Sequence, residues 1–131
     1  MKKLIRISLL FSFILLLSAA AEAQTRVVFS RGATSKVVTG TMYGFHSRRV
    51  FLIRVKRGQK LRVEEVGSSH PITIIEIRDP SHKDISDMDA SCNSMKWVSP
   101  TKRGDYRITV QECQKADPWR GRFRIRFKVT G

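Results

Sequence analysis

The sequence predicts an all-β protein, an antiparallel, jelly-roll-like β-sandwich of about eight short strands with one disulfide. Three observations indicate this class: apolar and polar residues alternate in short runs, Gly/Pro clusters separate the runs, and no segment of the mature chain keeps a helical period. Residues 122–129 alternate most clearly, with Phe, Ile, Phe and Val set between Arg, Arg, Arg and Lys. Successive side chains of a strand point to opposite faces, so this segment predicts one buried face and one cationic face.

Residues 1–23 have the pattern of a secretory signal peptide and are set apart from the fold. A basic start precedes an apolar run, and Ala21-Glu22-Ala23 matches the small-x-small site that signal peptidase cleaves. The apolar run is short for a membrane span, and no later stretch is apolar enough to cross a bilayer. We therefore expect a periplasmic or secreted protein with one domain over residues 24–131.

Short runs of β-type residues predict the strands of the mature chain in order. The expected strands, each bounded by Gly, Pro or polar turn residues, are 27–29, 36–43, 49–55, 60–66, 72–77, 96–99, 106–113 and 121–129. Gly40 interrupts the second run and marks a bulge or a close approach. The fifth run is apolar on both faces, which predicts a central strand.

Cys92 and Cys113 are the two cysteines of the chain, and both follow the signal peptide. An even number of cysteines in an oxidising compartment predicts a disulfide. The alternative, a catalytic thiol, would leave the other cysteine unpaired and open to oxidation. Closing a loop of this size would stabilise the fold by about 3 kcal/mol in the chain-entropy model.

Three turns, read in order, carry a resemblance to a known architecture. They are Gly58-Gln59, Asp79-Pro80 and Gly104-Asp105-Tyr106. In this order they resemble the turns of the bacterial pre-peptidase C-terminal-type β-sandwich. The front of the chain, Val27–Gly32 and Gly40–Phe45, is similar to the periplasmic inhibitors of g-type lysozyme. The resemblance implies a β-sandwich whose loops would enter the cleft of a lysozyme-like hydrolase.

The chain is strongly basic, with 25 Lys and Arg residues against 11 Asp and Glu and a net charge of +14. Loss of residues 1–23 would lower this charge to +12. Such a charge favours anionic partners and says nothing about the fold. Acidic proteins, anionic envelope polysaccharide and lipid head groups are the candidates, and intracellular nucleic acid is not expected of an exported chain.

Enzyme, metal and cofactor sites are not predicted. The chain lacks a Gly-x-Ser-x-Gly elbow, a His-Glu-x-x-His helix and a glycine-rich phosphate loop. His46, His70 and His82 fall in three separate loops. Glu64 and Glu65 are adjacent on one strand, so they point to opposite faces and cannot flank a glycosidic bond together.

The loop Asp84–Asn93 places oxygen side chains at alternate positions 87, 89, 91 and 93, as a calcium loop does at its start. Cys92 replaces the expected glycine, and Val98 stands where a closing glutamate should be. The alternative is a solvated turn whose acids are neutralised by nearby lysines. We therefore assign no metal to this loop.

Two loops are candidates for binding a partner. The turn between the second and third strands contributes aromatic and basic residues, and so does the loop before the last strand. In the alternative interpretation, Tyr43 and Phe45 cap the sandwich, and Trp119 closes one end of the core, which we favour for Trp119. Trp97 is expected in the core. The candidate partner-binding residues are Tyr43, Phe45, His46, Arg48, Arg49, Lys115, Trp119 and Arg120.

The cationic face of the last strand is a second candidate site, for anions. Its members are Arg122, Arg124, Arg126 and Lys128, and Arg107 is expected beside them on the preceding strand without an acidic neighbour. Alternate residues lie about 6.7 Å apart, which fits sparse charges better than duplex DNA phosphates at about 3.4 Å per strand. The alternative is edge protection and solubility.

The sequence thus predicts an exported, non-enzymatic binding protein. The first hypothesis is an inhibitor of g-type lysozyme that acts by inserting loops into the enzyme cleft. The second is a basic module that binds anionic envelope polysaccharide or lipid through the arginine-rich strand face.

Overall fold

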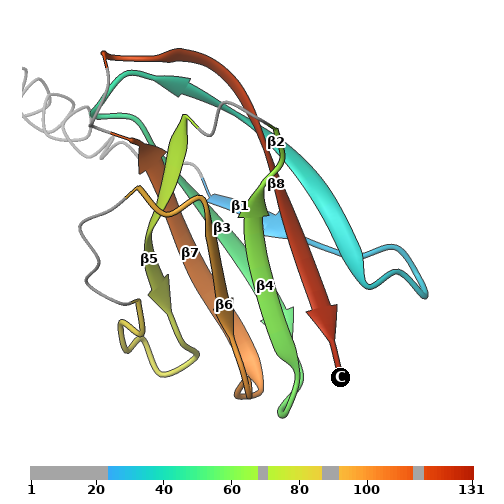
Figure 1. The fold of residues 1–131 in the computed structure, drawn as a ribbon. Helices are drawn as coiled ribbons and strands as arrows, with labels where there is room; N and C mark the ends of the chain where they lie inside the picture. Colours follow the sequence, from blue (N-terminus) through green and yellow to red (C-terminus); the bar gives the residue numbers. More distant parts are fainter. Residues whose placement is uncertain (1–23, 68–70, 87–91, 114–116) are drawn as a thin grey trace, which may run out of the picture.

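Two four-stranded sheets pack face to face in the computed structural model, which describes residues 24–67, 71–86, 92–113 and 117–131 (Figure 1). Over these residues the chain forms eight strands, and the predicted all-β sandwich is confirmed. The strands are β1 Gln24–Val27, β2 Ser35–Tyr43, β3 Arg48–Val55, β4 Lys60–Glu65, β5 Ile72–Arg78, β6 Met95–Val98, β7 Gly104–Glu112 and β8 Arg120–Thr130. The proposed signal peptide lies outside the described residues.

The strand order is β1-β3-β7-β5 in the first sheet and β2-β8-β4-β6 in the second. Strand β1 runs parallel to β3, and the other strand pairs of the described residues are antiparallel. The prediction of a first strand at 27–29 was wrong in position. Among the described residues, Gln24 to Val27 pair with β3, and Val28 is 59% exposed. The register with β3, and not the short apolar run, decides where β1 lies.

The core lies between the sheets and is built from the inward half of each alternating strand. Phe123, Ile125, Phe127 and Val129 of β8 all face this core, as the alternation predicted. Gly40 of β2 lies under the ring of Phe123, where an added Cβ would come within 2.3 Å of the ring. Gly40 is therefore a close-approach site, one of the two alternatives that its position in a strand suggested.

Strand β5 lies at the edge of the first sheet, so the prediction of a central position was wrong. The loop that follows β5 returns along its free side. Asn93 accepts hydrogen bonds from the Ile74 amide and the Thr73 hydroxyl, and the Ile85 amide donates to the Ile77 carbonyl. The described parts of this loop cover the open edge. A β-bulge between Ile74 and Glu76 places Ile72, Ile74 and Ile77 on the same inward face, while Glu76 and Arg78 point outward, so the expectation of two apolar faces was also wrong. No helix of the described segments is long and apolar enough to cross a membrane.

One end of the sandwich, which we call the turn end, gathers the turns at 56–59, 79–83 and 100–105. Thr101 joins the first turn to the third, because its hydroxyl accepts from the Gln59 amide and donates to the Lys56 carbonyl, at 3.0 and 2.7 Å. The Gln59 side chain accepts from the Lys56 amide at 2.8 Å. The three turns behind the family resemblance thus belong to one connected structure.

Asp79 joins the second turn to the third. Its buried carboxylate accepts hydrogen bonds from the Ser81 amide and hydroxyl, the Lys83 amide and the Lys102 ammonium group. The ammonium group of Lys102, followed by the Ser81 hydroxyl, holds the pKa of Asp79 far below its ordinary range. The buried Tyr106 hydroxyl accepts from the Lys102 amide at 2.9 Å, a corner that fixes the start of β7.

Candidate functional site

The opposite end of the sandwich, the loop end, brings together the two loops that the sequence singled out. We define it by segments 43–48, 92–94 and 117–121. Tyr43 at the end of β2 pairs directly with Arg120 at the start of β8, and Arg48 at the start of β3 pairs with Gln111 of β7. Figure 1 shows the β2–β3 turn and the start of β8 at the same end of the molecule. These two loops are far apart in sequence but form one surface.

Arg49 and Tyr43 support each other at the base of the β2–β3 turn. The Arg49 Nε donates to the Thr41 carbonyl at 2.9 Å, and its guanidinium carbon lies 6.0 Å from the centroid of the Tyr43 ring. Arg49 is half-buried, whereas Tyr43 is 63% exposed. Arg49 therefore holds the turn in place, and Tyr43 faces solvent instead of capping the core.

The tip of the same turn leaves polar side chains exposed. Gly44 adopts a φ of 108°, and the Ser47 amide donates to its carbonyl at 2.9 Å, which closes the turn. His46 and Arg48 are exposed, and Phe45 is half-buried. Of the predicted residues in this turn, Tyr43, His46 and Arg48 are thus the ones free to touch a partner.

Trp119 closes one end of the core, as the favoured interpretation predicted. Its side chain is half-buried against the core, and its ring lies over Gly121, where a Cβ would approach within 2.6 Å of Cζ2. Its amide donates to the carboxylate of buried Glu112. Arg120, the next residue, is exposed beside Tyr43. Lys115, the other predicted residue of this loop, lies outside the described residues.

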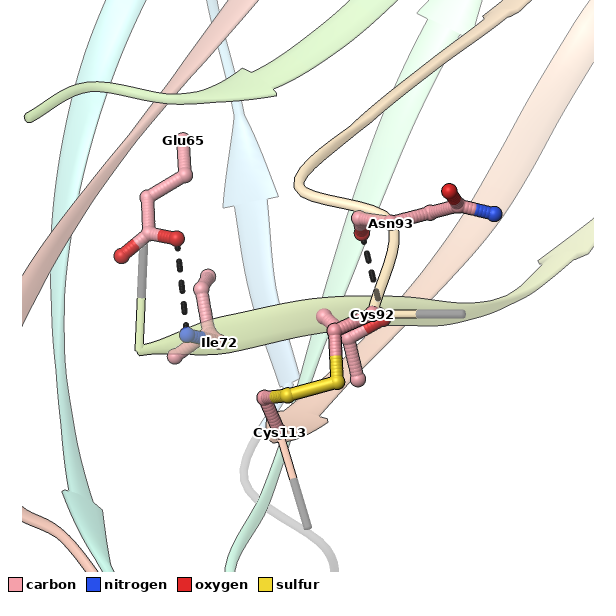
Figure 2. The surroundings of a disulfide bond; sticks show 6 residues. Glu65, Ile72, Cys92, Asn93 and Cys113 are labelled. Carbon is pink, nitrogen blue, oxygen red and sulfur yellow. Dashed lines mark hydrogen bonds between the residues drawn. A yellow bond between two sulfur atoms is a disulfide. The ribbon is translucent and has the colours of Figure 1, made fainter. Parts of the chain in front are cut away.

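The predicted disulfide joins Cys92 and Cys113, with 5.6 Å between their Cα atoms (Figure 2). It ties the segment before β6 of one sheet to the end of β7 in the other. Figure 2 also shows Glu65 turned toward the first residue of β5, where its carboxylate accepts from the Ile72 amide at 3.4 Å. The disulfide therefore links the two sheets covalently at the base of the loop end.

Glu112 is a residue of the site that the sequence reasoning missed. It is 1% exposed, and its Oε2 has no hydrogen-bond partner among the described residues. The signal was present, because apolar residues alternate at positions 106, 108 and 110 of the predicted strand 106–113, and position 112 continues that period of two. Glu112 was missed because a charged side chain is normally expected to point toward solvent.

The outer face of the second sheet carries the predicted anion-binding residues of β8. Arg122, Arg124 and Lys128 are exposed there, and Arg126 is half-buried. Lys60 and Arg62 of β4 extend this face, since Arg62 pairs with Lys128 across the strands. We call these six residues the cationic face.

Two expectations about neighbouring residues were wrong. Arg107 belongs to β7 in the first sheet, so it is not beside β8, and its guanidinium lies 3.8 Å from the Glu76 carboxylate. Trp97 is 57% exposed on the outer side of β6 and not in the core. Both errors have one cause: strand pairing joins residues that are distant in sequence, and alternation within a strand does not reveal its partner.

The loop Asp84–Asn93, whose start resembles a calcium loop and to which we assigned no metal, is described only in part. Asp87, Asp89 and Ser91 lie outside the described residues, while the Asp84 carboxylate accepts from the amide and hydroxyl of Ser86. These hydrogen bonds lower the pKa of Asp84. The described segments hold no group of three or more His, Cys, Asp or Glu side chains placed to bind a metal ion.

Comparisons with solved structures show the same fold in bacterial proteins. The chain matches the Aeromonas hydrophila periplasmic inhibitor of g-type lysozyme with a TM-score of 0.65 and 16% identity, over 82% of this chain and 96% of the inhibitor. It matches the Salmonella Typhimurium inhibitor at 0.60 and 15%, over 84% and 100%. The pre-peptidase C-terminal domain of a Bacillus anthracis collagenase matches at 0.51 and 13%, over 84% and 97%.

The sequence comparisons found no match: no family model matches the chain, and none of the curated proteins matches it in sequence. The structural likeness confirms the fold that the turn residues suggested, the pre-peptidase C-terminal-type β-sandwich that the lysozyme inhibitors share.

Proposed function

We propose that this protein is an exported, non-catalytic inhibitor of a g-type lysozyme and that it binds the enzyme through its loop end. The observation that carries the proposal is the fold, which extends over nearly the full length of solved inhibitors of such enzymes. The partner is then a protein, and the site of action is the periplasm. Export would leave Gln24 as the first residue, which N-terminal sequencing of the mature protein would test.

The chemistry of the loop end suits a glycosidase cleft. Such enzymes act through carboxyl groups set in a groove that holds sugar rings. Arg48 and Arg120 offer exposed guanidinium groups that can pair with a carboxylate, and Tyr43 offers an exposed ring for a sugar subsite. Tyrosine and arginine are also the residues that most often dominate the affinity of protein interfaces.

The bases of the two loops at the loop end are also fixed by contacts with the rest of the sandwich. The disulfide, the Arg49 bond to the Thr41 carbonyl and the packing of Trp119 over Gly121 fix the bases of both loops. A loop that is already ordered loses less conformational entropy when it binds, so more of the contact energy remains as affinity. The arrangement therefore supports insertion as a rigid wedge.

The net charge adds a condition on the partner. A mature chain of +12 is attracted to an enzyme whose cleft has a negative potential, and salt weakens that attraction. We expect association to slow as salt rises, with a smaller effect on dissociation.

The test is inhibition of a purified g-type lysozyme on peptidoglycan by residues 24–131. The wild-type protein should slow hydrolysis, and the triple variant Tyr43→Ala/Arg48→Ala/Arg120→Ala should be at least about tenfold weaker. The matched control removes three exposed cations of the turn end, Lys56→Gln/Arg57→Gln/Arg103→Gln, and should inhibit within about twofold of wild type. Failure of the wild-type protein in excess would end the proposal.

A further inference from the structure

The cationic face differs from the loop end in both position and chemistry. Its four β8 members extend along the middle of the second sheet, between β2 and β4 (Figure 1). At about 6.7 Å between alternate residues, the row from Arg122 to Lys128 spans about 20 Å. It is a linear surface, whereas the loop end is a cluster of tips.

The charges of this face are poorly balanced by acids. Glu64 is the one acidic residue on the outer side of this sheet among the described residues, and it serves two arginines, with Arg62 at 2.8 Å and Arg126 at 3.2 Å. Within the same described segments, no carboxylate lies within ion-pair distance of the other members of the face. Those members are Lys60, Arg122, Arg124 and Lys128.

Like charges also face each other directly. Arg62 of β4 is the cross-strand partner of Lys128 of β8, an arrangement that destabilises a sheet. Together with Lys60 and Thr130 they line an open hollow of about 140 Å³. A hollow lined by three cationic side chains suits one bound anionic group, because that group would relieve the repulsion.

An exposed aromatic ring lies next to this hollow. The Lys60 ammonium nitrogen lies 4.8 Å from the centroid of the Trp97 ring, and Trp97 pairs with Arg62 across β4 and β6. An indole face beside ammonium and guanidinium groups matches a sugar that carries an acidic group, since the ring can stack on apolar C–H groups while the cations bind the anion.

The other side of the cationic row is lined by hydroxyl groups. Ser35 pairs with Lys128, Thr39 with Arg124 and Thr41 with Arg122 across β2 and β8. Hydroxyls beside well-spaced cations suit a polymer that carries both hydroxyl groups and sparse charges. Duplex DNA offers a phosphate about every 3.4 Å per strand, which is too dense for a one-to-one match.

From these observations we propose that the cationic face binds an extended acidic polysaccharide, with an acidic sugar held between the hollow at Lys60, Arg62 and Lys128 and the ring of Trp97. A lipid surface fits less well because the middle of the face is charged. The exposed apolar residues Val37 and Met95 lie on the two edge strands, not in a central patch that could insert between lipids. This site is separate from the loop end, so the proposal of polysaccharide binding does not depend on whether the protein inhibits a lysozyme.

The test compares two variants of equal charge loss on heparin. Arg122→Gln/Arg124→Gln/Lys128→Gln removes three cations of the face, and Lys56→Gln/Arg57→Gln/Arg103→Gln removes three from the turn end. Each surface pair adds a few-fold in affinity, so the first variant should bind heparin about tenfold more weakly, and the second within about twofold of wild type. Equal losses in both variants, or no loss in the first, would overturn the proposal. Thermal unfolding of both variants checks that they fold.

Two further measurements separate a sugar polymer from other polyanions. Trp97→Ala changes no charge, and it should lower heparin affinity about threefold without altering its dependence on salt. Unchanged affinity would overturn the assignment to a sugar ring. Vesicles of phosphatidylglycerol and phosphatidylcholine should bind more weakly than heparin at the same salt concentration. Vesicle binding as tight as heparin binding, and lost in the same triple variant, would assign the face to lipid instead.

Discussion

The two ends of the sandwich differ in how their polar side chains are used. The turn end joins three turns through the buried side chains of Thr101, Asp79 and Tyr106. They bond to the Gln59 amide, the Lys102 ammonium group and the Lys102 amide, respectively. The loop end keeps its support below the surface and leaves Tyr43, His46, Arg48 and Arg120 exposed. At the turn end the buried polar groups form hydrogen bonds within that end, whereas at the loop end these four side chains face solvent.

This difference explains why the family resemblance predicts the fold but not the binding partner. The Gly-Gln, Asp-Pro and Gly-Asp-Tyr turns, which resemble those of the pre-peptidase C-terminal-type sandwich, all lie at the turn end, where they fix the fold. The candidate recognition residues lie at the other end, where loops can change without disturbing those turns. A chain can therefore share the architecture of the inhibitors at 15–16% identity while differing in what it binds.

The largest expected effect comes from removing the covalent tie behind the loop end. Cys92→Ser/Cys113→Ser opens a link between residues 21 apart and should lower the free energy of unfolding by about 3 kcal/mol. Urea denaturation of the oxidised wild type and the variant measures the difference. A loss below about 1 kcal/mol would mean that hydrogen bonds and packing hold this end without the disulfide.

A pair of glycines compares the two ends directly. Gly104 at the turn end has a φ of 136°, and an added Cβ would lie 2.7 Å from Pro80, so Gly104→Ala should cost about 2–3 kcal/mol. Gly44 at the loop end has a φ of 108° but open space around it, so Gly44→Ala should cost only about 1 kcal/mol from the backbone. Equal unfolding midpoints for the two variants would contradict the tighter packing of the turn end.

The turn end should also respond to acid through Asp79. Because its pKa is lowered in the folded protein, its ionised form contributes stability above the ordinary value of 3.8, and this contribution fades as pH falls below that value. Asp79→Asn should therefore be less stable than wild type at pH 7, and the gap should narrow toward pH 2. Unfolding midpoints across this range measure the gap, and a constant gap would exclude a role for the ionised form.

The smallest expected effect on stability is at the loop end, the proposed recognition surface. Tyr43→Ala removes a mostly exposed ring and should change the free energy of unfolding by no more than about 0.5 kcal/mol. Its effect should appear in lysozyme inhibition instead. A loss of stability as large as that of Gly104→Ala would mean that Tyr43 serves the fold.

The sequence predicted the features that depend on neighbours along the chain. The alternation of β8 correctly placed Phe123, Ile125 and Phe127 in the core, and the cysteine count predicted the disulfide. It failed where sheet partners matter: β5 is an edge strand covered by its own loop, and Arg107 lies in the other sheet beside Glu76. Pairing between distant strands is decided by the whole core, and no local pattern encodes it.

The candidate site was predictable in part for the same reason. The residue types of the two loops suggested recognition, but their meeting at one end follows from the pairing of Tyr43 with Arg120. Trp97 was expected in the core, yet the pairing of β6 with β4 turns its ring outward beside Lys60. Charge and aromatic content thus identified candidates, and only the sheet register showed which of them lie together.

Amide hydrogen exchange of the protein bound to a g-type lysozyme tests the central claim most directly, because it shows which end is covered. The account predicts new protection in segments 43–48 and 117–121 and unchanged exchange in segments 56–59 and 100–105. Protection of the turn end, or of β8 from Arg122 to Lys128 without the loop end, would contradict it.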